Sequence, residues 1–131
     1  MRRLVRTIVA AALLTPGTAF AVTEDDFVVR NAQDIVDICD TPKTDPLYTA
    51  AANFCQGYLV GAYAYHRALY SQPGRKDPVC LPEPPPTRTA AIEAYVAWLK
   101  ANPKYLDENA VEALVKFMTE DYACAKKGKA G

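Results

Sequence analysis

The sequence is poor in the residue types that catalysis usually requires, and it contains a single histidine, His66, among 131 residues. It has no GxSxG motif, no HExxH motif and no glycine-rich loop of the kind that cradles phosphate. A helix through Cys55 and His66 would separate the two by about three turns, so they could not act as a pair. Because an enzyme needs a nucleophile, a base or a metal in a workable arrangement, we predict a non-enzymatic protein with no catalytic residues and no cofactor.

The chain also lacks an excess of positive charge and a long hydrophobic run. Lys and Arg together number 15, as do Asp and Glu, so the formal net charge is zero. Nucleic-acid binding needs a basic surface, and we therefore expect no nucleic-acid partner. The apolar stretch from Ile8 to Leu14 is too short to cross a membrane.

That short apolar stretch instead has the pattern of a secretory signal peptide. Met1-Arg2-Arg3 and Arg6 form a basic region before it, and Ala19-Phe20-Ala21 follows it as a small-x-small cleavage site. We predict that residues 1–21 are removed on export to an oxidising compartment and that residues 22–131 form a single domain without a membrane span. Without the three leader arginines, 12 basic residues face 15 acidic ones, a net charge of −3.

Four cysteines lie in the predicted mature chain: Cys39, Cys55, Cys80 and Cys124. Their even number and the oxidising compartment favour two disulfides. No CxxC pair is present and His66 has no partner at ligand spacing, so we expect no zinc or other metal site. Three pairings remain open from the count alone.

Helical periodicity is the main structural signal, and the stretch from Asp45 to Tyr70 is its strongest example. Asp45 is a good N-cap and Pro46 suits the first helical position, which predicts a central helix for the other elements to pack around. A row of small residues on this helix predicts the close approach of another backbone. The row consists of Gly57, Gly61, Ala64 and Ala68.

Shorter helices are predicted on both sides of this stretch, and no segment shows sustained strand alternation. Asn31 would cap a helix from Ala32 to about Cys39, after an extended arm at residues 22–30. A third helix is expected from Thr87 to Ala101, and Asp107 would cap a fourth that ends near Asp121. The predicted fold is all-α, a small disulfide-stabilised bundle of four helices in up-and-down order.

Between the second and third of these helices lies a proline-rich segment, Ser71–Pro86. Its six prolines exclude a helix, because proline lacks the backbone donor and clashes with the preceding turn. Cys80 lies in its middle. We interpret it as a stiff, ordered loop within one domain.

Several short motifs, taken in order, resemble one known family. Cys55-Gln56-Gly57-Tyr58-Leu59-Val60-Gly61 is similar to its C-x-G-Y-x-x-G signature, and Cys80-Leu81-Pro82 to its C-x-P. Tyr95–Leu99 with Asn102-Pro103, and Ala110–Leu114 followed by Cys124, resemble its later segments, although Asn102 replaces the usual histidine. These motifs cover residues 35–124 and resemble the Rap/Tai family of immunity proteins against type VI secretion amidase effectors.

The resemblance implies a periplasmic protein that binds and inhibits a peptidoglycan amidase effector, often as a homodimer. The motif residues would be Cys55, Gly57, Tyr58, Gly61 and Pro103. The residues alone lead only to an exported, disulfide-linked binding module. A small periplasmic chaperone or envelope stress protein on a similar scaffold is the alternative.

An up-and-down bundle also predicts the disulfide pairing. It places the loop at residues 71–86 beside the end of the fourth helix, so Cys80 should meet Cys124. Cys39 would then meet Cys55, which lies in the third turn of the central helix.

The predicted partner-binding surface combines the outer row of the central helix with the loop that follows it. Along that row, polar residues give way to apolar and aromatic ones, and tyrosine and arginine are common interface anchors. The residues are Val60, Tyr63, Tyr70, Gln72, Arg75 and Lys76. The loop would also present Asp77. In the opposing interpretation, Tyr63 and Tyr70 cover the third helix or the N-terminal arm.

Overall fold

The computed structural model describes residues 21–124 and confirms the all-α prediction. Four α-helices and two 3-10 helices follow one another, and within this range the only strand-like pairing is an isolated bridge between Val79 and Ala123. The order is η1 (Glu24–Val28), α1 (Ala32–Cys39), α2 (Tyr48–Tyr70), α3 (Arg88–Ala101), η2 (Pro103–Tyr105) and α4 (Ala110–Asp121). Apart from Ala21, the predicted signal peptide lies outside the described residues.

The helix boundaries correct three sequence expectations. The N-terminal arm forms η1 instead of an extended segment. Asp45 does not cap α2, because its side chain accepts a hydrogen bond from the Leu47 amide at 2.8 Å and closes a turn before the helix. Asp107 does not cap α4: η2 extends the connection, and Asn109 accepts hydrogen bonds from the amides of Val111 and Glu112.

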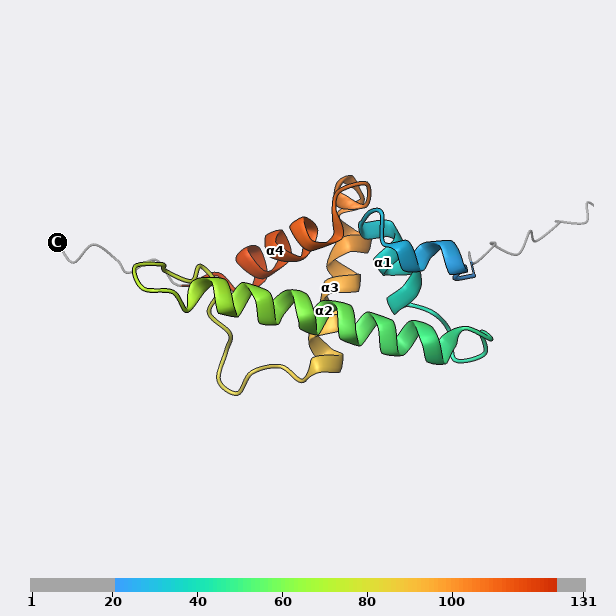
Figure 1. Ribbon diagram of the computed structural model, residues 1–131, viewed down its shortest axis with the longest axis horizontal. Helices are drawn as coiled ribbons and strands as arrows, with labels where there is room; N and C mark the ends of the chain where they lie inside the picture. The colour runs from blue at the N-terminus through green and yellow to red at the C-terminus, as the bar shows by residue number, and fades with distance from the viewer. Residues whose placement is uncertain (1–20, 125–131) are drawn as a thin grey trace, which may run out of the picture.

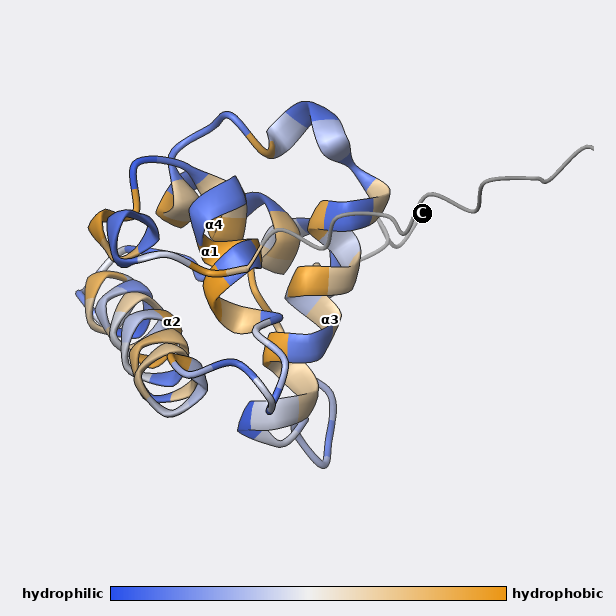
Figure 2. Cartoon of the chain, turned by 90° about the vertical axis from the view of Figure 1, so that its right-hand side faces the viewer, coloured by the Kyte–Doolittle hydropathy of each residue, from blue (hydrophilic) through white to orange (hydrophobic). Residues whose placement is uncertain are grey.

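The short helix α1, and not α2, is the element around which the others pack. Five of its eight residues are buried, whereas only four of the 23 residues of α2 are. α1 contacts η1, α2, α3 and α4 (Figure 1). Ile35, at 0% exposure, is among the largest fully buried side chains. Hydrophobic residues concentrate where α1, α3 and α4 face one another (Figure 2).

The arrangement is not the up-and-down bundle that the sequence suggested. α3 lies across α2 instead of alongside it, and the segment at residues 71–87 forms a wide loop between them (Figure 1). α2 thus packs mainly through its N-terminal half, where Ala51 and Cys55 are buried against the core. This leaves much of the helix surface exposed.

The row of small residues on α2 belongs to that exposed surface. Gly57, Gly61, Ala64 and Ala68 all face outward, and no atom that could block an added Cβ lies within 4 Å of either glycine. The expectation of a backbone packed closely at this row is therefore wrong for residues 21–124.

Both predicted disulfide pairings are present in the structure. Cys39–Cys55 ties the end of α1 to α2, and Cys80–Cys124 ties the proline-rich loop to the residues that follow α4. They close segments of 16 and 44 residues respectively.

Candidate partner-binding site

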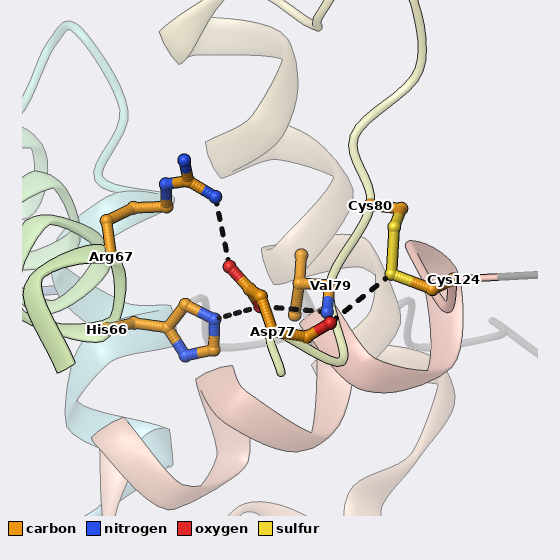
Figure 3. Close-up of a disulfide and its surroundings, with 6 residues drawn as sticks. All are labelled: His66, Arg67, Asp77, Val79, Cys80 and Cys124. Atoms are coloured by element: carbon orange, nitrogen blue, oxygen red, sulfur yellow. Dashed lines mark hydrogen bonds and ion pairs between the residues drawn. A yellow bond between two sulfur atoms is a disulfide. The ribbon is translucent and has the colours of Figure 1, made fainter. Parts of the chain in front are cut away.

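The loop after α2 is fastened to that helix by a single carboxylate, Asp77. Its Oδ1 atom lies 2.9 Å from Nε2 of His66 and accepts a hydrogen bond of 2.9 Å from the Val79 amide. Its Oδ2 atom accepts a hydrogen bond of 3.0 Å from Nη1 of Arg67 (Figure 3). Asp77 therefore points inward, contrary to the expectation that the loop presents it to a partner.

The same loop is fastened on its other side to the end of α4. The amide of Cys80 donates to the Tyr122 carbonyl at 2.7 Å, and the amide of Cys124 donates to the Pro78 carbonyl at 3.1 Å. The Cys80–Cys124 disulfide lies directly beside these bonds, with Sγ of Cys124 3.5 Å from the Asp77 carbonyl oxygen (Figure 3). The loop is thus held between two helices, which agrees with the prediction of a stiff, ordered segment.

The hydrogen bonds at Asp77 affect its ionisation. Burial raises the pKa of this carboxyl group, but the Val79 amide, His66 and Arg67 together outweigh that effect and lower the pKa below its usual value. A carboxyl group with a lower pKa in the folded state adds stability above its unfolded pKa of about 3.9. That stability is lost as the pH falls through the folded pKa.

We therefore expect Asp77→Asn to lower the free energy of unfolding at pH 7 by roughly 1–3 kcal/mol, because charged hydrogen bonds are replaced by weaker ones. The difference from the parent protein should shrink as the pH approaches 3. Urea unfolding at pH 7, 5 and 3 measures it, with the exposed Asp107→Asn as the control. A defect of constant size at all three pH values would contradict this account.

The predicted interface residues differ in how exposed they are. Gln72, Arg75 and Lys76 are exposed on the loop, and Val60 is 37% exposed. Tyr63 and Tyr70 are half-buried, because their rings flank the buried imidazole of His66 at centroid distances of 6.5 and 4.7 Å. The two tyrosines thus enclose a histidine of their own helix, with their remaining surface open.

Beside this surface lies a groove of about 460 Å³ between α2, α3, α4 and the proline-rich loop. Buried side chains form its floor, and half-buried or exposed ones form its walls. The floor consists of Leu59, Tyr95, Leu114, Phe117 and Met118, and the walls of Val60, Tyr63, Leu81, Pro85, Pro86, Arg88, Ala91, Ile92 and Tyr122. The lining comes from α2, α3, the segment around α4 and the proline-rich loop.

Tyr95 is one of the buried residues on the floor of this groove. Its side chain is 1% exposed, and its hydroxyl group donates a hydrogen bond of 2.9 Å to the Ala110 carbonyl, which joins α3 to the start of α4. Burial is the main cause that raises the pKa of Tyr95, so the hydroxyl stays protonated. Its ring packs against Phe117 at 5.4 Å.

Within residues 21–124, no cluster of three or more His, Cys, Asp or Glu side chains could hold a metal ion. In the same part of the chain, no helix is both long and apolar enough to cross a membrane. The described structure is that of a small all-α, disulfide-linked module whose notable features are a stiff loop, an open helix face and an apolar groove. Such features are suited to binding.

The chain belongs to the Rap1a immunity proteins, whose family model matches residues 31–124. It is therefore an immunity protein and not an enzyme, and membership implies inhibition of a cognate type VI secretion effector. The resemblance drawn from the motifs is confirmed. No match was found among curated proteins or among solved structures.

The matched motif residues have different structural roles. Cys55 forms a disulfide, Tyr58 is half-buried and stacks on Phe54 at 6.0 Å, and Pro103 begins η2. Gly57 and Gly61 lie on the open face of α2.

Sequence reasoning missed the partner of His66 and the groove. The histidine could have been placed in the interior, because it lies seven residues, about two helical turns, after Leu59 on the face that also holds Cys55. The groove left no comparable signal, since its lining comes from four separate segments.

Proposed function

We propose that the mature protein binds and inhibits a peptidoglycan amidase effector in the periplasm. Membership of the immunity family supports an inhibitor of a type VI effector, and the signal-peptide pattern supports export. The observation that carries the binding mode is the double fastening of the loop through Asp77 and Cys80–Cys124. A loop already held in place loses little conformational entropy when it binds.

The proposed binding surface is the C-terminal half of α2 together with the start of the loop. Val60 and Tyr63 supply apolar area, and Arg75 and Lys76 supply positive charge beside it. Tyr70 and Gln72 complete the surface. Arginine and tyrosine are favoured anchors because they bury a large area while still forming hydrogen bonds.

Co-expression with a candidate secreted amidase, taken from a neighbouring gene where one is found, tests the proposal. We expect protection from lysis and a stable complex in a pull-down. Tyr63→Ala and Arg75→Ala should each weaken the complex by about tenfold or more. Thr49→Ala and Asn53→Ala, at exposed positions in the N-terminal half of the same helix, should change affinity by less than about twofold.

The experiment tests amidase inhibition and the location of the binding surface separately. Unchanged lysis without a complex would reject the amidase proposal, and holdase activity toward unfolded proteins at low pH would then favour the chaperone alternative. A complex that survives both substitutions would place the interface elsewhere. Sedimentation of the purified protein tests the homodimer that the family resemblance implies.

A further inference from the structure

The apolar groove has one charged residue in its lining, Arg88. Among the described residues Arg88 makes no ion pair, whereas Arg30, Arg67, Lys100 and Lys116 each do. It lies at the start of α3, whose first turn carries no acidic residue. The positive end of the helix dipole and the guanidinium group therefore act together beside the groove.

Apart from Arg88, the lining has no charged side chain. Ala91, Ile92 and Tyr95 of α3 and Leu114 and Met118 of α4 all contribute to it. The hydroxyl group of Tyr95 is already bonded to Ala110. The occupant that matches this lining has an anionic head and an apolar body.

Two other occupants fit the lining poorly. The chain beyond Cys124, Ala125–Gly131, has three lysines and no large apolar side chain, so its charge is opposite to what Arg88 favours. A peptide strand would bring backbone polar groups against a wall with no sheet edge to pair with, and unpaired buried groups are costly. An alkyl chain has no such groups.

We propose that the groove binds one free, unbranched fatty carboxylate of about ten to twelve carbons, a size suited to pockets of 300–1,000 Å³. The carboxylate lies at Arg88, and the alkyl chain lies over Ile92, Leu114 and Met118. Met118 suits this role, because its flexible side chain adapts to apolar ligands. The site does not depend on the proposed amidase inhibition, although Val60 and Tyr63 belong to both surfaces.

Titration calorimetry of the exported, mature protein with octanoate, decanoate and dodecanoate below their micelle concentrations tests the site. We expect one saturable site per chain. Each loss of two methylene groups should weaken binding by about tenfold, since each buried methylene contributes about 0.8 kcal/mol. Dodecyltrimethylammonium, with the same tail and the opposite charge, should bind more weakly than dodecanoate.

Two matched pairs of variants locate the ligand. Ala91→Trp places a large ring in the groove and should weaken dodecanoate binding at least about tenfold, whereas Ala97→Trp, on the exposed side of α3, should leave it unchanged. Arg88→Gln should reduce the preference for dodecanoate over the cationic analogue by about fivefold. Lys43→Gln, at an exposed turn, should retain the preference.

Several results would overturn the proposal. These are the absence of saturable binding, equal binding by Ala91→Trp and Ala97→Trp, and an unchanged head-group preference in Arg88→Gln. Binding to anionic phospholipid vesicles but not to monomeric dodecanoate would identify a membrane surface instead. If the protein forms a dimer that does not bind dodecanoate and is not dissociated by it, a second copy of the chain covers the groove.

Discussion

Replacing Cys80 and Cys124 together with alanine is expected to lower the free energy of unfolding by about 4 kcal/mol. The disulfide closes a segment of 44 residues, so its loss restores much conformational freedom to the unfolded chain. Replacing Cys39 and Cys55 removes a closure of 16 residues and should cost about 3 kcal/mol. Urea unfolding of the two double variants and the parent measures both effects.

The two disulfides should also differ in what their loss does to the loop. Without Cys80–Cys124, the loop retains the Asp77 hydrogen bonds and the backbone bonds to Tyr122 and Pro78. Those bonds are partly exposed. We therefore expect the backbone amides of residues 79 and 80 to exchange faster in the variant without Cys80–Cys124 than in the variant without Cys39–Cys55. If the shorter closure proved to be the more stabilising one, the loop-entropy account would be wrong for this protein.

Ile35→Ala is expected to lower the free energy of unfolding by about 2–5 kcal/mol, the usual range for emptying a fully buried aliphatic site. Ile35 lies on α1, which contacts all three other α-helices, so the surrounding side chains cannot collapse into the cavity without moving several elements. We expect the upper half of the range for this reason. Chemical denaturation followed by circular dichroism measures it.

The matched control is Val111→Ala on α4. Val111 is 36% exposed, and its truncation should change the free energy of unfolding by less than about 0.5 kcal/mol. The comparison tests whether the fold depends on α1. An Ile35→Ala variant as stable as Val111→Ala would show that the core does not centre on this short helix.

The local features of the chain were readable because they depend on neighbouring residues. The predicted cap at Asn31 accepts a hydrogen bond from the Asp34 amide, and the proline content of residues 71–86 excludes a helix. The expected cap of α4 at Asp107 was wrong, because the 3-10 turn at Pro103 moves the helix start to Asn109.

The sequence did not show in the same way which helix lies at the centre of the core. α2 is long and strongly periodic, which made it the expected centre, whereas burial is decided by what packs on a helix and not by its length. Tyr65 of α2, for example, is 69% exposed despite its large ring. α1 is buried on several sides because η1, α2, α3 and α4 all reach it.

The sequence by itself determined the helical class, the four cysteines available for cross-linking, the stiff loop and the motifs of an immunity family. These depend on residue type and spacing along the chain. Only the tertiary structure decided that α3 lies across α2, that Asp77 meets His66, and that Arg88 lines an otherwise apolar groove. Those features depend on the angles at which helices pack, and such angles follow from side chains of several segments acting at once.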